Sequence, residues 1–230
     1  MGNLVVYTLD DGIATLTLNN GKVNAVSHEL IADFNSGLDQ AEQAGAVVIV
    51  TGQPGILSGG YDLKVMKLGP QSAIDLVTAG STLARRLLSH PYPVIVACSG
   101  HAVAKGAFLL LSADYRLGVE GAFSIGLNEV QIGMTLHHTG LLLARDRLMP
   151  SAFQRSVTCA EMFTPQGALA AGFFDRVVAP DELLTAAREV AQRLKKLNMP
   201  AHKNTKLKAR NALLTALDAA IELDKKMSVI

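Results

Sequence analysis

Two segments of this 230-residue chain carry backbone groups suited to chemistry on a carbonyl oxygen. Leu57-Ser-Gly-Gly-Tyr-Asp-Leu-Lys64 follows an apolar run at 46–51, and Ser99-Gly-His-Ala-Val-Ala-Lys-Gly-Ala-Phe108 follows the apolar run at 94–98. Each pattern is typical of a buried strand that turns through small residues toward a helix. The first amides of a helix lack internal acceptors and lie at the positive end of its dipole, so they can hold an anionic oxygen.

Two such turns on neighbouring strands are expected to meet, because ligands of open α/β folds bind beyond the carboxyl ends of the strands. Two amides that converge on one carbonyl oxygen form an oxyanion hole, in which each donor is worth about 3–4 kcal/mol in the transition state. The competing interpretation of each segment is a tight turn with no ligand.

A carboxylate is supplied by a third segment, Ser124-Ile-Gly-Leu-Asn-Glu-Val-Gln-Ile-Gly133. From the residues alone, we expect Glu129 to lie at the surface. If it is buried, desolvation will raise its pKa and suit it to proton transfer near neutral pH. The turn at 99–108 has no acid of its own, since Phe108 stands at its helix start. The adjacent pair His137-His138 does not share a helix face, so we expect a polar helix start and not a metal site.

Composition and motifs exclude several other functions. The 21 Lys and Arg residues nearly balance the 20 Asp and Glu residues, which gives no support for nucleic-acid binding. The basic cluster Lys203–Arg210 is expected to be a solvated helix face, with a contact for a phosphorylated ligand as the alternative. The phosphate-binding P-loop, the dinucleotide fingerprint and the nucleophile elbow are incomplete or missing.

Targeting features point to a cytoplasmic protein. No apolar run approaches the roughly 20 residues that span a bilayer, so no membrane partner is expected. No secretory signal is visible. The two cysteines do not suggest a disulfide framework, and Cys98 is expected to be inert core.

The order of elements predicts an α/β fold with mainly parallel strands. Leu4–Leu9 and Ile13–Leu18 flank a hairpin turn, Asp10-Asp-Gly12, and a helix capped by Ser27 follows. Strand and helix patterns then alternate. We expect a core over residues 1–178 and a helical C-terminal arm over 179–230. The remaining expected elements are strands at 46–51, 94–98, 115–119 and 174–178, a helix ending near His90, and helices at 106–113 and 183–197.

These segments, in this order and spacing, resemble the crotonase (enoyl-CoA hydratase/isomerase) superfamily from the N-terminal hairpin to about residue 197. Residues 57–64 are similar to its Phe-Ser-Ala-Gly-Ala-Asp-Leu-Lys signature, and residues 93–106 to its Pro-Val-Ile-Ala-Ala-Val-Asn-Gly-Ala-Ala-x-Gly-Gly-Gly run. Asn19-Asn-Gly-Lys-Val-Asn-Ala-Val26 is similar to the segment before its first helix. Phe123–Gly133 is similar to its Phe-x-x-Pro-Glu-x-x-x-Gly segment.

The resemblance implies a crotonase-like ββα superhelix core that binds an acyl-CoA thioester, with no cofactor apart from the coenzyme A of the substrate and no metal. By position, the thioester carbonyl accepts hydrogen bonds from the backbone N–H groups of Tyr61 and Lys105. The other residues implied to contact the substrate are Asp62, Leu63, Lys64, Phe108, Lys22, Val23 and Ala25. Because family members build trimers through C-terminal helices, the arm is expected to serve self-association, although it is shorter here than in many members.

The resemblance also bears on the reaction. Family hydratases use two glutamates; the second matches Glu129, whereas the first falls at Phe108, which cannot transfer a proton. A Δ3,Δ2-enoyl-CoA isomerase of this family works with one glutamate, so isomerisation with Glu129 as the acid/base is the leading expectation. Two alternatives stay open. One is a hydratase or hydrolase-like member that recruits His101, His137 or His138, and the other is a non-catalytic acyl-CoA-binding subunit in which Tyr61 and Lys105 crowd the oxyanion hole.

Overall fold

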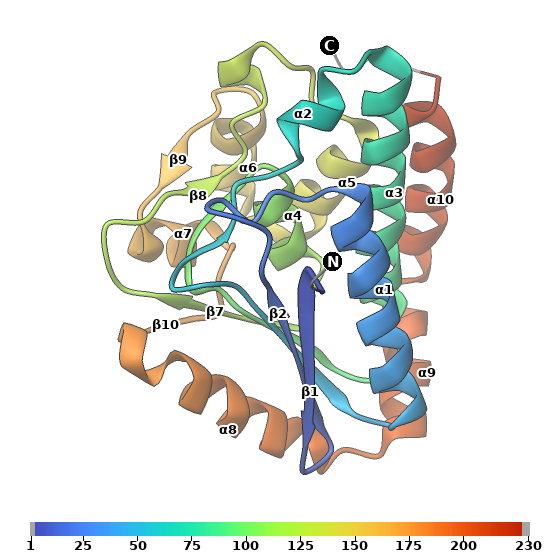
Figure 1. Ribbon diagram of the computed structural model, residues 1–230, viewed down its shortest axis with the longest axis vertical. Helices are drawn as coiled ribbons and strands as arrows, with labels where there is room; N and C mark the ends of the chain where they lie inside the picture. Colours follow the sequence, from blue (N-terminus) through green and yellow to red (C-terminus); the bar gives the residue numbers. More distant parts are fainter. Residues whose placement is uncertain (1–2, 227–230) are drawn as a thin grey trace.

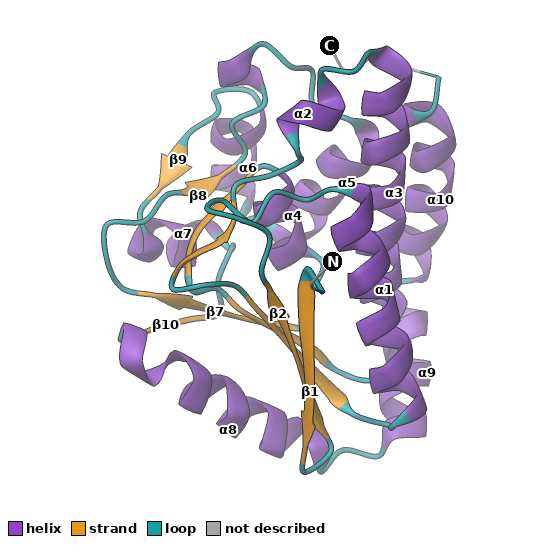
Figure 2. Ribbon diagram, viewed as in Figure 1, coloured by secondary structure: helices purple, strands orange, loops and turns teal. Residues whose placement is uncertain are grey.

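A computed structural model describes residues 3–226 as an α/β protein built around a six-stranded sheet (Figures 1 and 2). Its strand order is β1-β2-β3-β5-β7-β10, in which β1 is antiparallel to β2 and every other neighbouring pair is parallel. The strands are β1 (Val5–Asp10), β2 (Ile13–Leu18), β3 (Val47–Thr51), β5 (Val94–Ala97), β7 (Tyr115–Val119) and β10 (Arg176–Val178). The predicted N-terminal hairpin and the mainly parallel sheet are confirmed.

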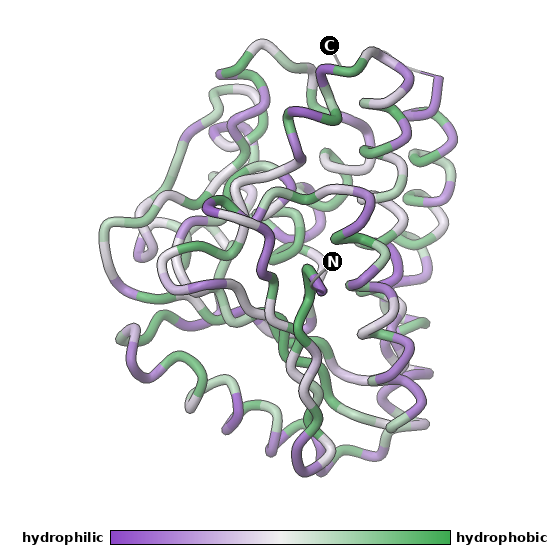
Figure 3. Tube along the Cα trace, viewed as in Figure 1, coloured by the Kyte–Doolittle hydropathy of each residue, from purple (hydrophilic) through white to green (hydrophobic). Residues whose placement is uncertain are grey.

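Both faces of this sheet are buried, because successive strand residues point to opposite sides. In β3, Val48 and Val50 join the larger apolar core, on the side of α1 (His28–Gln43) and α3 (Pro70–Ser89). Val47 and Ile49 pack under α8 (Leu183–Lys195). Figure 1 shows α8 lying alone along one side of the sheet and the other helices gathered on the opposite side. In the hydropathy colouring of Figure 3, the central strands are largely apolar, while α8 alternates between polar and apolar residues.

A second, four-stranded sheet has the order β4-β6-β8-β9. Three of its strands each follow one strand of the first sheet in the chain: β4 after β3, β6 after β5, and β8 after β7. A helix closes each unit, so the chain repeats a strand–strand–helix pattern, which is the crotonase-like ββα arrangement that the sequence predicted. The strands are β4 (Gly55–Ser58), β6 (Gly100–Val103), β8 (Ile125–Gly126) and β9 (Met162–Phe163).

The family resemblance implied a ββα core, but the local sequence patterns did not predict the individual strands of the second sheet. The loop expected at 52–60 contains β4, and the turn expected at 99–108 begins with β6. These strands have four residues each and contain glycine, so they show little hydrophobic periodicity. They pair because glycine permits close approach: a Cβ on Gly100 would lie 2.0 Å from the backbone of Gly55.

Helix boundaries follow the sequence prediction more closely. The Ser27 hydroxyl accepts from the Leu30 N–H at 3.2 Å and caps the first long helix, as expected. The third helix ends at Ser89, next to the predicted end at His90. The helices that accompany α8 are α1 (His28–Gln43), α2 (Leu63–Met66), α3 (Pro70–Ser89), α4 (Lys105–Leu111), α5 (His138–Arg147), α6 (Pro150–Val157), α7 (Pro165–Ala171), α9 (Met199–Ala209) and α10 (Asn211–Asp224). Two short 3-10 helices cover Val130–Ile132 and Pro180–Glu182.

The C-terminal helices pack back onto the rest of the chain. Helix α8 covers one face of the sheet, and α10 contacts α3 and α5 (Figure 1). The carboxylate of Asp224, at the end of α10, accepts hydrogen bonds from the His138 N–H at 2.7 Å and the Thr139 N–H at 3.0 Å. The last helix therefore caps the start of α5. Self-association through this arm stays a prediction.

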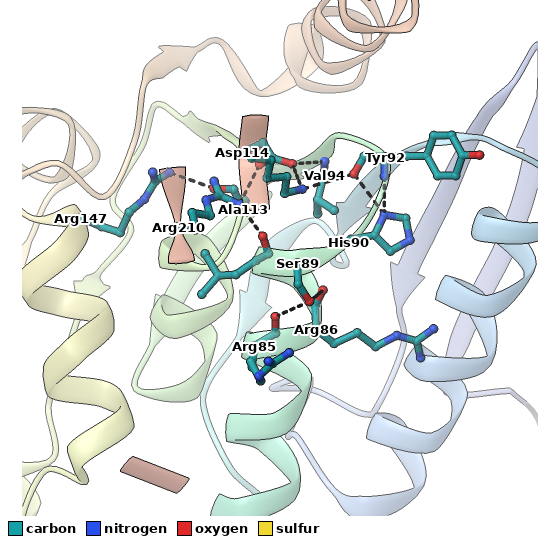
Figure 4. Close-up of polar contacts among 12 residues, drawn as sticks. Arg85, Arg86, Ser89, His90, Tyr92, Val94, Ala113, Asp114, Arg147 and Arg210 are labelled. Atoms are coloured by element: carbon teal, nitrogen blue, oxygen red, sulfur yellow. Dashed lines mark hydrogen bonds and ion pairs between the residues drawn. The ribbon is translucent and has the colours of Figure 1, made fainter. Parts of the chain in front are cut away.

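The basic cluster on α9 is not a uniformly solvated face, which corrects the expectation for residues 203–210. Lys203 and Lys208 are exposed, but Lys206 is buried and its Nζ lies 2.6 Å from the Asp114 carboxylate. Arg210 pairs with the same carboxylate at 2.9 Å. Figure 4 shows Asp114 between Arg210 and Val94, whose backbone N–H donates to the Asp114 carboxylate at 2.7 Å. The cluster thus anchors α9 to the strand β5 that leads toward the predicted site.

Candidate active site

The two turns predicted to supply amides meet in the structure. Val26 bridges the first turn: its N–H donates to the Gly60 carbonyl at 2.8 Å, and its carbonyl accepts from the Asp62 N–H at 2.9 Å. This pairing directs the intervening Tyr61 N–H away from Val26. A Cβ built on Gly60 would lie 3.7 Å from the Lys105 nitrogen, so the second amide is close to the first turn. Within residues 3–226, neither the Tyr61 nor the Lys105 N–H donates to a protein acceptor.

An unusual backbone conformation sets the direction of the second amide. Ala104, which precedes α4, has φ 51° and ψ −118°, a combination that residues with a Cβ rarely adopt. Such a residue typically costs about 1–3 kcal/mol and persists only where its surroundings hold it. Its N–H donates to the Gly126 carbonyl at 3.0 Å, and its carbonyl accepts from the Phe108 N–H at 3.1 Å. The strain falls immediately before the amide predicted to bind the substrate.

Glu129 is buried, contrary to the surface position that the residues alone favoured. It is only 7% exposed and lies between β8 and the 3-10 helix at 130–132. Its carbonyl accepts from the Met134 N–H at 2.9 Å, which closes the loop around it. Burial raises the pKa of Glu129 to about 7, against a smaller opposing effect of its own backbone amide. Its Oε2 has no hydrogen-bond partner among the described residues, so one carboxyl oxygen is free to accept or deliver a proton.

Phe108 and His137 form an apolar wall on α4 and at the start of α5. Phe108 is fully buried, and its ring meets the His137 ring edge to face with 5.3 Å between centroids. A Cβ at Gly140 would lie 2.7 Å from Phe108 and 2.9 Å from His137, so a glycine is required for this contact. Burial lowers the pKa of His137 to about 4, which leaves its imidazole neutral near pH 7. The predicted helix start at His137-His138 is confirmed, but His137 is buried rather than solvated.

The side chains of Tyr61 and Lys105 are directed toward α3. Lys105 Nζ donates to the Gly80 carbonyl at 2.6 Å, and a Cβ on Gly80 would lie 2.2 Å from the Tyr61 hydroxyl oxygen. Burial raises the pKa of the Tyr61 phenol and lowers that of the Lys105 amine to about 7. Tyr61 is half-buried, and its ring packs against the larger apolar core.

The other predicted substrate contacts fall on two segments that lie side by side. The Gly59 N–H donates to the Val23 carbonyl at 2.8 Å, which joins 22–25 to 57–64. Asp62 caps α2 by accepting from the Lys64 N–H at 2.8 Å. Lys22, Val23, Leu63 and Lys64 are exposed, and Ala25 and Asp62 are half-buried. These residues are accessible to a ligand that extends out from the two amides.

Sequence reasoning missed Asn24, which holds these two segments together. It is fully buried with φ 45°, a left-handed conformation that asparagine tolerates better than most residues. Its Nδ2 donates to the Leu18 and Leu57 carbonyls, both at 3.2 Å, and its carbonyl accepts from the Ser58 hydroxyl at 2.7 Å. The signal was an asparagine in a short turn-rich segment, a residue type suited to bonding with nearby backbone groups.

His101 lies outside the wall formed by Phe108 and His137. It is half-buried on β6, its Nδ1 accepts from the Ser124 N–H at 3.0 Å, and its ring meets Phe123 edge to face. Across residues 3–226, no group of three or more His, Cys, Asp or Glu side chains is placed to hold a metal ion. No helix in that range is long and apolar enough to cross a membrane. Cys98 is buried core, as predicted.

Comparison with known proteins decides the family. Residues 8–229 match the family model described as enoyl-CoA hydratase/isomerase. The chain belongs to this family. A crystal structure of an enoyl-CoA hydratase/isomerase family protein from Pseudomonas syringae is similar to it. The two sequences are 70% identical, the TM-score is 0.97, and 98% of each chain is covered. The present chain is 40% identical to an apo enoyl-CoA isomerase structure from Mycobacterium tuberculosis, with a TM-score of 0.93 and 97% and 98% of the two chains covered.

Relatives differ in the reaction named for them. Carnitinyl-CoA dehydratase from Salmonella arizonae is 31% identical over 198 residues, which cover 84% of this chain and 75% of that protein. The family assignment therefore implies an acyl-CoA thioester as substrate, and the choice among family reactions depends on the site residues.

Proposed function

We propose that this family member is a Δ3,Δ2-enoyl-CoA isomerase that uses Glu129 as its one acid/base. The observation that carries the proposal is a buried Glu129 combined with Phe108, which stands at the position of the other glutamate of family hydratases. The pKa of about 7 suits Glu129 to both halves of a proton shuttle, because a carboxyl with a pKa near the working pH can accept and release a proton.

The reaction conserves all atoms of the substrate. The Glu129 carboxylate removes a proton from the carbon alpha to the thioester carbonyl of a 3-enoyl-CoA. The electron pair of that C–H bond delocalises onto the carbonyl oxygen and forms a dienolate. Glu129, now protonated, delivers the same proton to the gamma carbon, and the double bond moves from C3–C4 to C2–C3. No water and no external oxidant take part.

The dienolate oxygen is the atom that the Tyr61 and Lys105 amides would stabilise. Backbone donors fixed before the reaction stabilise developing charge without reorganisation, which is why each is worth several kcal/mol in a buried site. The free amides of both residues and the close approach of their turns support this role. The side chains of Tyr61 and Lys105 pack against α3, and this placement also supports the role, because it argues against side chains that block the oxyanion hole.

The packing around Phe108 supports isomerisation over hydration. Hydration needs a second group to hold and activate water, but Phe108 and His137 pack against each other at the corresponding place. Burial lowers the pKa of His137 to about 4, so its imidazole is uncharged near pH 7 and cannot act as an acid there. In the proposed site, this apolar pair would also help to exclude water from a reactive dienolate.

The decisive experiment gives the purified protein a trans-3-enoyl-CoA and, separately, a trans-2-enoyl-CoA. The proposal expects the ultraviolet absorbance of the conjugated thioester to appear with the first substrate and to persist with the second. Loss of that absorbance with the 2-enoyl-CoA, with 3-hydroxyacyl-CoA as product, would instead assign a hydratase. Tight binding of both thioesters without turnover would assign a binding subunit.

A matched pair of variants tests the role of Glu129. Glu129→Gln removes the titratable group with little change of shape, and Glu189→Gln makes the same change on an exposed glutamate of α8, on the other side of the sheet. Turnover by Glu129→Gln at the rate of the unmodified protein would rule out the single-base mechanism.

Three further properties complete the proposal. We infer a cytoplasmic enzyme that needs no cofactor beyond the coenzyme A of its substrate and that assembles as a trimer or a dimer of trimers. The family resemblance supports the assembly, and the half-exposed Leu223 on α10 supplies apolar surface for it. Light scattering of the purified protein measures the mass, and a monomeric mass would contradict this part.

A further inference from the structure

The two residues whose amides are proposed to bind the substrate carbonyl share one anchoring point on α3. Lys105 Nζ donates to the Gly80 carbonyl at 2.6 Å. The Tyr61 hydroxyl contacts the same residue so closely that a Cβ on Gly80 would lie 2.2 Å from its oxygen, and it lies 3.4 Å from the Val77 carbonyl oxygen. The Lys105 ammonium is also 5.9 Å from the centre of the Tyr61 ring. One turn of α3 therefore holds both side chains.

Packing alone does not account for a lysine at this position. Lys105 is 1% exposed, and the Gly80 carbonyl is the one acceptor of its Nζ within the described residues. No carboxylate within that range forms a salt bridge with it. An apolar side chain of similar length would avoid the desolvation of an amine. The buried amine instead links the start of α4 directly to α3.

The link acts on a strained turn. Ala104, with φ 51°, immediately precedes Lys105, and its neighbours must hold it in a conformation that suits glycine better than alanine. The backbone contacts of Ala104 hold the turn on the side of β8 through Gly126, and the Lys105 side chain holds it on the side of α3. Loss of either contact allows the turn to relax and the Lys105 N–H to rotate.

We propose that Lys105 and Tyr61 are positioning residues. Through their common contact with Gly80, their side chains hold the two oxyanion-hole amides so that both point to the same carbonyl oxygen. The inference rests on the proposed role of those amides in binding a thioester carbonyl. It assigns a purpose to side chains that replace the small residues usual at these family positions. Lys105 transfers no proton in this scheme.

The consequence is a specific effect on transition-state binding. A displacement of about 1 Å in a catalytic group can cost roughly a hundredfold in rate. Negative charge on the substrate oxygen is greatest in the dienolate, so loss of the anchor lowers kcat much more than it raises KM. We expect Lys105→Met to lower kcat about tenfold to a hundredfold.

A spectroscopic test measures the hole without requiring turnover. Hexanoyl-CoA, a saturated thioester, serves as the probe, and difference infrared spectroscopy reads the stretching frequency of its bound carbonyl. Two converging hydrogen bonds lower that frequency relative to free hexanoyl-CoA. Lys105→Met should lose a large part of the shift while it still binds the probe and unfolds cooperatively.

The chain offers a matched control and a rescue. Lys206→Met removes another buried lysine, on α9, whose partner is Asp114, and should leave the carbonyl shift and kcat unchanged while lowering thermal stability. Ala104→Gly, added to Lys105→Met, relieves the strain in the turn and should restore much of the shift and of kcat. Should Lys105→Met fail to fold, Gly80→Ala provides a second route, because the new methyl group displaces the Tyr61 hydroxyl while alanine favours the helix.

The outcomes separate this inference from the proposed reaction. A carbonyl shift that falls in Lys105→Met and recovers with Ala104→Gly supports the anchor, even if the unmodified protein turns over no 3-enoyl-CoA and the proposed reaction fails. A folded Lys105→Met with the full shift and full kcat overturns the anchor while isomerisation stands. Absence of any shift in the unmodified protein overturns the oxyanion hole and the anchor together.

Discussion

Phe108 and His137 pack edge to face, with 5.3 Å between their ring centroids, at the place where a second acid would be needed for hydration. The contact joins the helix that follows one proposed oxyanion-hole amide to the start of α5. It leaves Glu129 as the proposed proton-transfer group and places an aromatic ring where hydration would need an acid. The chemistry proposed for this protein thus depends on a ring–ring contact as much as on a carboxylate.

Replacement of Glu129 by glutamine should abolish measurable isomerisation. General acid–base catalysis typically contributes 10²- to 10⁴-fold, and the loss here should lie in that range because no other titratable group is proposed to replace it. Steady-state kinetics with a 3-enoyl-CoA measures the change. The Glu189→Gln control should retain full activity, and an equal loss in both variants would point to a general effect on folding.

The rate should rise with pH with a midpoint near 7. Glu129 has a pKa of about 7 in the folded protein and must be ionised to remove the alpha proton, so the active fraction increases as pH rises through that value. A profile of kcat/KM from pH 5 to pH 9 measures the midpoint. A flat profile over this range would contradict a carboxyl base with a raised pKa.

The same pKa has a consequence for stability. In the folded protein the carboxyl holds its proton up to about pH 7, whereas in the unfolded chain it ionises near its ordinary value of 4.5. The contribution of Glu129 to stability is therefore fully present below about pH 4.5 and is lost as pH rises toward 7, by an amount on the order of 3 kcal/mol. His137 acts in the opposite direction, because burial lowers its pKa.

Comparison of the unmodified protein with Glu129→Gln separates the pH-dependent contribution of Glu129 to stability from that of His137, which is present in both. Denaturant melts of the unmodified protein and of Glu129→Gln should give free energies of unfolding whose difference changes between pH 4.5 and pH 7. The variant should gain stability relative to the unmodified protein as pH rises. A difference that does not depend on pH would show that the folded and unfolded pKa values are alike.

Truncation of Phe108 should weaken both the fold and the site. Phe108→Ala removes a fully buried ring and leaves a cavity, which typically costs about 3–5 kcal/mol. The proposed site places this ring close to Glu129, so water that enters the cavity should lower the pKa of Glu129 and the midpoint of the pH–rate profile. Phe108→Leu, which keeps the wall apolar, should retain more stability and a midpoint close to 7.

Asp114 should matter for stability and not for catalysis. Its carboxylate accepts from the Val94 N–H and pairs with Lys206 and Arg210, as Figure 4 shows for Val94 and Arg210. Asp114→Ala leaves Lys206 buried without its ion pair, and breaking such a pair typically costs about 3–5 kcal/mol. Thermal unfolding measures the loss. Alanine in place of the exposed Lys208 should change the stability little, and kcat at 25 °C should be unchanged in both variants.

Asn24 should be as sensitive as a core residue. Alanine cannot make its hydrogen bonds to the Leu18 and Leu57 carbonyls and is disfavoured at φ 45°, so Asn24→Ala should lose about 2–4 kcal/mol of stability. Because Asn24 joins 22–25 to 57–64, the KM for acyl-CoA should also rise. An unchanged KM in a destabilised variant would limit Asn24 to a role in folding.

The sequence by itself determined the class of fold and the elements of the proposed site. Apolar runs such as 46–51 and 94–98 predict buried strands because the signal lies in residues that are adjacent in the chain. The small-residue turns that follow these runs predict free amides for the same reason. The segment order was enough to identify the family resemblance and to show that Phe108 stands where a glutamate is usual. These features depend on neighbours in the chain.

Only the tertiary structure decided how those elements act together. Glu129 has no local signal for burial, since the exposed Val130 and Gln131 follow it, and its raised pKa arises from the packing of distant segments. The second sheet forms because glycine backbones 45 residues apart, at Gly55 and Gly100, approach within contact. Likewise, the common anchor of Tyr61 and Lys105 exists only where α3 passes both turns. Burial, close approach and shared partners are properties of segments far apart in sequence, which no local pattern encodes.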